Sequence, residues 1–176
     1  SLEEVISITS DFIQTNPNKE WITGRGWQYT YFESGLPDHT TMKALDLDKP
    51  IFIKAYDGHS AYANPKALEL AGITSATSFE GFGEIVKDSQ GNPTGALKED
   101  AMDLVGKWVS APSKADQLDA LRKGMNLAAS LGITSIQNAS GSEEELKLFQ
   151  QLLSSNELTL RYAAAFSVGE NSTQED

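Results

Sequence analysis

Apolar residues recur at helical spacing in three long stretches of the chain. Residues 114–131 are the clearest, with an apolar stripe on one face and Gly132 as a left-handed stop. A second helix is predicted over residues 2–15, and a third begins after Ser142. All three have a serine at the N-cap position. In the first two, an acidic residue three positions later completes a capping box.

Shorter apolar runs bounded by Gly, Pro and Asn predict strands and turns. A hairpin is indicated where residues 84–87 and 94–97 flank a turn rich in Gly, Asn and Pro. Asn64 and Pro65 begin a helix that should end near Gly72. Further strands are predicted at residues 21–27, 51–56, 133–136 and 158–166, and short helices over residues 40–47 and from about Glu99.

The order of these elements indicates the fold class. Helices and strands alternate along the chain with one hairpin inserted, which argues for an α/β fold with a mainly parallel sheet. The length of 176 residues suits one domain with a sizeable core. We therefore expect a single α/β unit over residues 1–169, followed by a polar, disordered tail at residues 170–176.

Composition excludes several classes of function. The net charge of −11 repels phosphate backbones, so no nucleic-acid partner is expected. No apolar run approaches the roughly 18 residues of a membrane helix, so no membrane partner is expected either. The chain has no cysteine and only two histidines, His39 and His59. A complete catalytic metal site within these residues is therefore not expected.

Ionisable residues cluster in Asp57-Gly58-His59-Ser60, directly after the predicted strand at residues 51–56. Loops after parallel strands converge on one face of α/β folds, where active sites are commonly built. His59 could bind or polarise a substrate, with Asp57 orienting its ring and Gly58 allowing a sharp turn. The alternative explanation of the same residues is a tight turn with an incidental exposed histidine. A nucleophilic Ser60 is disfavoured because the chain has no G-x-S-x-G elbow.

Three further side chains lie where a pocket could form. Glu99 is either a pocket carboxylate or a residue in the first turn of a helix. Trp27 ends a glycine-rich strand and either lines an apolar pocket or packs in the core. Asn138 ends the strand at residues 133–136 and either binds a ligand or caps the turn.

Five segments, in order along the chain, carry a family resemblance. They are WITGRGW at 21–27, DGHSAYANPKAL at 57–68, GIT at 72–74, GEIVKDSQGNPTGALKE at 83–99 and GITS at 132–135. Together they resemble the amidohydrolase-3 (YtcJ-like) branch of the metal-dependent amidohydrolase superfamily, which includes N-substituted formamide deformylases. The resemblance implies an α/β fold, a partial (β/α) barrel with an inserted β-hairpin. It also implies hydrolysis of amide or N-acyl C–N bonds by water bound to a divalent metal, often zinc.

The resemblance also assigns roles by position. It implies that His59 and Glu99 are catalytic residues on the substrate side of the metal centre. Asp57, Trp27 and Asn138 become substrate-binding residues. The metal ligands of such enzymes are an H-x-H pair, a lysine, two later histidines and an aspartate. None has a counterpart here, so no metal ligand is assigned to this chain.

The missing ligands imply that the chain is an internal fragment of a longer enzyme. The longer protein would hold zinc and a small-molecule amide, whereas the fragment would bind no metal and be inactive alone. Exposed apolar flanks of residues 51–56 and 158–166 would favour self-association. The alternative is an autonomous, non-catalytic module that binds a small molecule or another protein. The compartment is unassigned, with the cytoplasm favoured and export of the longer protein open.

Overall fold

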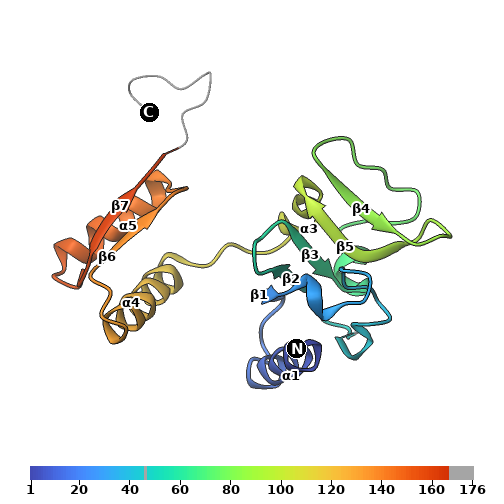
Figure 1. Cartoon of the computed structure of the whole chain (residues 1–176), viewed down its shortest axis with the longest axis horizontal. Helices are drawn as coiled ribbons and strands as arrows, with labels where there is room; N and C mark the ends of the chain where they lie inside the picture. Colours follow the sequence, from blue (N-terminus) through green and yellow to red (C-terminus); the bar gives the residue numbers. More distant parts are fainter. Residues whose placement is uncertain (46, 167–176) are drawn as a thin grey trace. The chain divides into compact units, whose positions relative to one another are not determined.

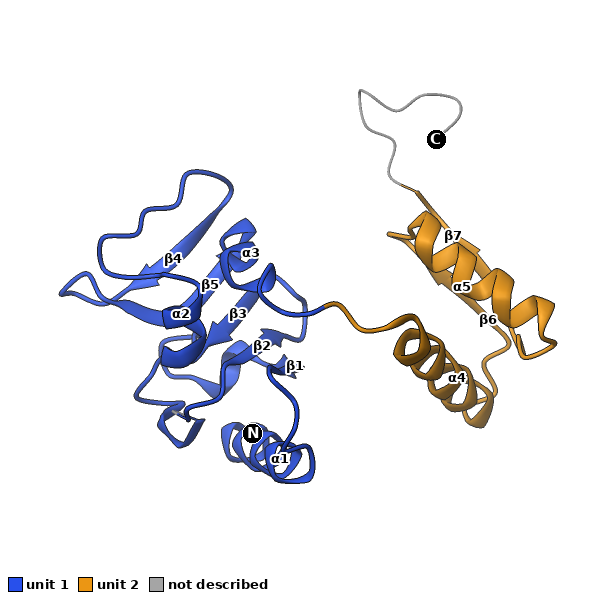
Figure 2. Cartoon of the chain, turned by 180° about the vertical axis from the view of Figure 1, so that it is seen from behind, with its two compact units in different colours: residues 1–110 blue, residues 111–176 orange. Residues whose placement is uncertain are grey.

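The computed structural model describes residues 1–45 and 47–166. Contacts divide the chain into two compact units, Ser1–Ser110 and Ala111–Asp176 (Figure 2). Each unit has its own sheet and its own hydrophobic core, so each is described by itself.

This division bears on the single α/β unit expected over residues 1–169. Contacts between residues group the chain into two compact units, and the single unit over residues 1–169 stays a prediction. The tail predicted at residues 170–176 lies outside the described residues.

The first unit is built on a five-stranded mixed sheet with the order β1-β2-β3-β5-β4 (Figure 1). Only β1 and β2 run parallel, while β2–β3, β3–β5 and β5–β4 are antiparallel pairs. The prediction of a mainly parallel sheet is therefore wrong for this unit. The strands are β1 (Ile22–Trp27), β2 (Ile51–Ala55), β3 (Ser60–Ala63), β4 (Gly83–Lys87) and β5 (Pro93–Glu99).

Strand β3, which the sequence did not predict, changes the direction of the chain. All four of its residues are buried, so its sequence lacks the alternation of a half-exposed strand. It pairs back onto β2, and the segment between them is the turn of a β-hairpin rather than a loop leading to a helix. The second hairpin, predicted from residues 84–87 and 94–97, is confirmed as β4 and β5.

Short helices and 3₁₀ turns surround this sheet. Helix α1 (Leu2–Thr15) begins with the capping box predicted for Ser1 and Glu4. The helix predicted over residues 40–47 is reduced to a single 3₁₀ turn. The remaining pieces are α2 (Pro65–Leu70), α3 (Asp103–Gly106) and the 3₁₀ turns Tyr29–Tyr31, Lys43–Leu45 and Asp100–Met102.

All residues of strand β2 except Lys54 are buried, which places the hairpin turn on a rigid support. Ile51 and Ile53 pack with Trp27 in a cluster that the apolar face of α1 also contacts. Phe52 points into the other cluster, with Leu97 of β5. The turn after β2 therefore projects from a strand whose position is fixed by packing on two sides.

The second unit combines two helices with a two-stranded parallel sheet. Helices α4 (Lys114–Ser130) and α5 (Glu143–Ser154) begin at their predicted serine caps. Strand β6 (Ser135–Asn138) begins two residues later than predicted, and β7 (Arg161–Ala164), which pairs with it, is shorter than the predicted range of 158–166. No helix within the described residues is long and apolar enough to cross a membrane.

Candidate functional site

The candidate site lies where the β2–β3 turn meets the end of β5. Antiparallel pairing sets Ser60 opposite Lys98, so His59 and Glu99 adjoin just beyond the paired residues. The Glu99 N–H donates to the His59 carbonyl oxygen at 3.0 Å. The His59 Nδ1 lies 3.0 Å from Glu99 Oε2. The sheet register thus brings together the two residues predicted to be catalytic, 40 positions apart in sequence.

Contact with Glu99 favours the charged form of His59. The hydrogen bond to the Glu99 carboxylate, together with its negative charge, raises the pKa of His59 above its ordinary value. The His59 side chain is 65% exposed and that of Glu99 30%, so solvent screens this ion pair. Because Nδ1 is directed at Glu99, Nε2 is the ring nitrogen that can face a ligand.

Glu99 has a backbone conformation that is rare for a residue with a side chain. Its φ of 47° and ψ of −131° occur where β5 ends and the next 3₁₀ turn begins. Such a conformation costs on the order of 1–3 kcal/mol and concentrates at functional sites. Gly83 lies opposite Glu99 on β4, and a Cβ there would come 2.4 Å from the Lys98 carbonyl oxygen. The close approach of β4 therefore requires glycine at position 83.

Asp57 holds the turn rather than the imidazole ring. Its Oδ1 accepts the backbone N–H of His59 at 3.0 Å and the Tyr29 hydroxyl at 3.2 Å. The His59 N–H is the main cause that lowers the pKa of the Asp57 carboxyl group. The Tyr29 hydroxyl also lies 3.2 Å from the Oγ of Ser60, which is buried. Ser60 therefore contacts a phenol rather than a histidine, which disfavours a serine nucleophile further.

Arg25 also contacts this turn, and the sequence analysis assigned neither Arg25 nor Tyr29 to it. The Arg25 Nε donates to the Tyr56 carbonyl oxygen at 3.1 Å. Gly58 has a φ of +87°, as the predicted sharp turn requires, and lies against the Arg25 guanidinium. Parallel pairing of β1 with β2 brings Arg25 and Tyr29 to the turn. No local sequence motif predicts the register of this pairing.

Trp27 is a buried support for this group of residues. Its side chain is 1% exposed, and its indole N–H donates to the Ile53 carbonyl oxygen at 2.9 Å. Its ring packs edge-on against Tyr29 with the ring centroids 5.2 Å apart. Trp27 thus helps to place Tyr29, and its predicted contact with substrate stays a prediction.

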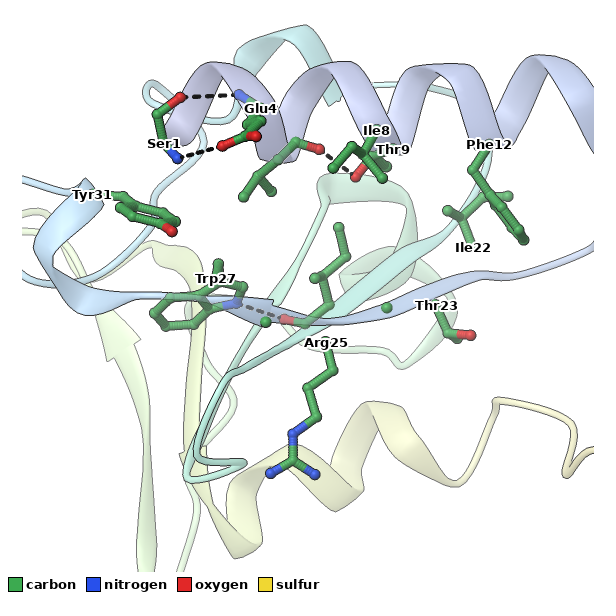
Figure 3. A pocket seen from close by; sticks show the side chains of 14 residues that line it. Ser1, Glu4, Ile8, Thr9, Phe12, Ile22, Thr23, Arg25, Trp27 and Tyr31 are labelled. Atoms are coloured by element: carbon green, nitrogen blue, oxygen red, sulfur yellow. Dashed lines mark hydrogen bonds and ion pairs between the residues drawn. The ribbon is translucent and has the colours of Figure 1, made fainter. Parts of the chain in front are cut away.

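A cavity of about 300 Å³ lies between α1 and β1 (Figure 3). Trp27 lines it together with apolar side chains such as Ile8 and Phe12. Neither His59 nor Glu99 is among its lining residues. The cavity is therefore separate from the His59–Glu99 pair, although Arg25 is among the residues that line it.

Asn138 lies in the second unit, at the end of β6 where it was predicted. Its Nδ2 donates to Glu145 Oε2 at 2.6 Å, and its Oδ1 accepts the Ser140 N–H at 3.0 Å. Both ends of this amide therefore serve the loop that leads into α5. Its predicted contact with substrate stays a prediction.

A complete metal centre does not fit the residues present. Within residues 1–45 and 47–166, no group of three or more His, Cys, Asp or Glu side chains is arranged to hold a metal ion. His59 and Glu99 form only a pair, whereas catalytic zinc takes three protein ligands. Any catalytic metal would need ligands from elsewhere.

Comparison with known proteins gives a family match and three informative relatives. The model of the amidohydrolase family matches residues 1–175. Protein LONG AFTER FAR-RED 3 of Arabidopsis thaliana is 31% identical over 134 residues, which cover 76% of this chain and 23% of that protein. The putative amidohydrolase YtcJ of Bacillus subtilis (strain 168) is 31% identical over 152 residues, 85% of this chain and 27% of that protein. The N-substituted formamide deformylase of Arthrobacter pascens is 26% identical over 156 residues, which cover 86% of this chain and 29% of that protein.

Two solved structures share the fold. An uncharacterized metal-dependent hydrolase from Pyrococcus horikoshii aligns with a TM-score of 0.58 and 24% identity, covering 94% of this chain and 31% of its own. Another from Pyrococcus furiosus aligns with a TM-score of 0.55 and 20% identity, covering 94% and 32%. The chain thus spans about a quarter of the length of the curated relatives and about a third of these structures.

Proposed function

Because this chain belongs to the amidohydrolase family, we propose that it forms the substrate side of the active site in a metal-dependent amidohydrolase. The reaction adds water across an amide or N-acyl C–N bond of a small molecule and releases a carboxylic acid and an amine. One relative is named as an N-substituted formamide deformylase, which supports this bond type. In this proposal the first unit is part of a (β/α) barrel and β4–β5 is its inserted hairpin.

The observation that carries the proposal is the His59–Glu99 pair. An imidazole whose Nδ1 bonds a carboxylate presents Nε2 in a fixed direction, as general acid–base residues require. Glu99 raises the pKa of His59, so the imidazole stays protonated to a higher pH than a free histidine would. That proton is available to the carbonyl oxygen or to the departing nitrogen of a bound amide.

The metal of this enzyme would be held outside the chain. The family implies a divalent ion, zinc in our proposal, which when bound polarises a carbonyl group and acidifies water. The described residues do not supply its ligand set, and the chain covers only 23–29% of the three curated relatives. The chain is then a fragment of a longer protein and is inactive alone.

Zinc binding and turnover by the isolated chain test the fragment proposal. Residues 1–176 are titrated with Zn²⁺, and release of amine from an N-formyl amine is followed. We expect weak zinc binding and no amine release, because His59 and Glu99 alone are too few ligands. Tight, stoichiometric zinc together with turnover would overturn this proposal.

The longer protein provides the complementary test of the site. In that protein, His59→Ala should lower kcat/KM for an N-acyl amine by about 10²–10⁴-fold, the usual contribution of a general acid–base residue. The matched control is His39→Gln, because His39 bonds Tyr62 and takes no part in the site. Full activity of the His59→Ala variant would remove the role assigned to His59.

A second candidate function rests on the α1–β1 cavity. A volume of about 300 Å³ with mostly apolar lining suits a small apolar molecule, which favours an autonomous, non-catalytic binding module. Indole is titrated into the isolated chain while the methyl signals of Ile8 and Ile53 are followed by NMR. Saturable shifts confined to the cavity would support this module, and their absence would dismiss it.

A further inference from the structure

Arg25 lies against the β2–β3 turn in a fixed position. Its side chain leaves β1 on the side away from α1 (Figure 3). Its Nε is held by the Tyr56 carbonyl oxygen at 3.1 Å. A Cβ on Gly58 would come 3.2 Å from the Arg25 Nη2 and 3.9 Å from its Nη1. The guanidinium therefore covers Gly58, the residue that immediately precedes His59.

The terminal nitrogens of Arg25 have no acidic partner in the described residues. No carboxylate oxygen in residues 1–45 and 47–166 lies within 4.0 Å of its guanidinium, and the side chain is exposed. Asp57, the neighbour of Gly58, directs its carboxylate to Tyr29 and to the His59 N–H instead. This is notable in a chain with 25 acidic and 14 basic residues, where acidic partners are plentiful.

Another arginine of the chain shows the contrast. Arg122 binds both carboxylate oxygens of Glu157 through Nε and Nη2. In Arg25 a carbonyl oxygen occupies Nε, the residue is exposed, and no carboxylate of the described residues engages Nη1 or Nη2. The fork of a guanidinium matches the two oxygens of a carboxylate, and fixing it in advance lowers the entropy that binding costs.

We propose that Arg25 binds a carboxylate group of the substrate, so that the enzyme acts on small amides that also carry a carboxylate. This inference rests on the proposed function and adds the substrate class to it. The carboxylate would bind the Nη atoms of Arg25 at the same β2–β3 turn that carries His59, so the amide of the same molecule would extend toward His59. Arg25 is then a specificity residue that takes no part in breaking the C–N bond.

Binding by the isolated chain tests this inference without any metal or turnover. The ¹⁵N-labelled chain is titrated with N-acetylglycine, which carries an amide and a carboxylate, and with neutral N-acetylglycinamide. Sodium chloride keeps the ionic strength equal in both titrations. We expect saturable shifts of the Arg25 Nε–H and of the Gly58 and His59 amides with the carboxylate only.

Three variants assign the binding to the guanidinium. Arg25→Gln should weaken N-acetylglycine at least about tenfold, because a charge-assisted pair of hydrogen bonds is lost. Arg25→Lys keeps the charge without the fork and should also bind more weakly than the natural chain. Arg161→Gln is the matched control, since it removes an exposed arginine of the second unit whose guanidinium bonds Ser135 and Thr134.

Several outcomes would overturn the inference. They are equal shifts with the neutral amide, no saturable shift at all, or undiminished binding by the Arg25→Gln chain. Unchanged Ala61 and Leu97 amide signals in Arg25→Gln confirm that the sheet behind the turn is intact. No step of this titration involves hydrolysis, so the carboxylate-binding inference can fail while the proposed function stands. Equally, the proposed function can fail while carboxylate binding by Arg25 is observed.

Discussion

At the scale of single residues, the charge of Glu99 controls the charge of His59. Glu99→Gln removes the carboxylate and keeps the size of the side chain. We expect the pKa of His59 to fall toward its ordinary value of 6.5, because the Glu99 carboxylate is what raises it. An NMR titration of the imidazole measures this. Glu84→Gln is the matched control, since Glu84 pairs with Lys98 in the same sheet. An unaltered His59 pKa in the Glu99 variant would show that the pair does not form in solution.

The same pair makes stability depend on pH, with a definite sign. The pKa of His59 is higher in the folded chain than in the unfolded one, so the folded state binds the proton more tightly. The resulting stabilisation is complete below about pH 6.5, the unfolded value, and is lost as the pH rises through the folded value. The natural chain should therefore exceed Glu99→Gln in stability by more at pH 5.5 than at pH 8.5. Urea denaturation at the two pH values measures the difference, and a reversed order would contradict this linkage.

Tyr29 is a second residue whose removal has a specific outcome. Tyr29→Phe deletes the hydroxyl that bonds Asp57 and Ser60 and leaves the packing of the ring on Trp27. We expect the pKa of Asp57 to rise toward its ordinary value and stability to fall by about 0.5–1.5 kcal/mol. Carboxyl ¹³C shifts and urea denaturation measure the two effects. Tyr31→Phe, in the same 3₁₀ turn, should leave the Asp57 pKa unchanged.

The sequence predicted the site residues in the turn itself, but not the residues of neighbouring segments that contact the turn. Asp57 and His59 stand in a visible motif, and Glu99 ends another. Arg25 and Tyr29 come to the turn only through the pairing of β1 with β2, which depends on distant packing. The expectation that Asp57 orients the imidazole was wrong in detail, because a backbone N–H in the tight turn competes for the same oxygen.

At the scale of elements, Asn64 joins three pieces of the first unit. It is fully buried, and its Oδ1 accepts the N–H groups of Ile51 and Ala67. Its Nδ2 donates to the carbonyl oxygens of Leu45 and Lys49. Asn64→Ala leaves these buried groups without partners, so we expect a loss of about 2–4 kcal/mol in the free energy of unfolding.

Urea denaturation of the isolated chain measures that loss. Asn16→Ala is the control, because Asn16 also bonds backbone but is only partly buried, at the end of α1. It should cost less than about 1 kcal/mol. Equal losses in the two variants would mean that the buried amide is not a junction between elements.

Elements with local signals were predicted well, and those defined by tertiary pairing were not. The starts of α1 and α4 could be predicted because the hydrogen bonds of a capping box form within four consecutive residues, which the sequence shows directly. Strand β3 gave no such signal, since a four-residue strand buried on both faces has no polar alternation. Missing that strand turned an antiparallel hairpin into a supposed strand–helix connection and led to the mainly parallel sheet.

At the scale of the whole molecule, one of the two places predicted for exposed apolar surface needs revision. The core strand β2, expected to expose its flanks, buries Ile51, Phe52 and Ile53 almost completely. In the stretch at residues 158–166, the other place predicted, Phe166 is exposed. Exposed apolar side chains occur in both units, and one group lies on and after α4 in the second unit: Leu127, Leu131, Ile133 and Ile136. The β6–β7 sheet in that unit has only two strands, too few for a stable sheet by itself.

These exposed side chains lead us to expect self-association of the isolated chain. Leu127 and Leu131 lie one helical turn apart and are 62% and 67% exposed. Sedimentation velocity at rising concentration should show dimers or larger species, because association removes this apolar area from water. The double change Leu127→Glu with Leu131→Glu should restore the monomer. Asn126→Glu with Ser130→Glu adds the same charge at the same spacing one residue earlier and should not. A chain that is monomeric at high concentration without any substitution would contradict fragment behaviour and favour the autonomous module.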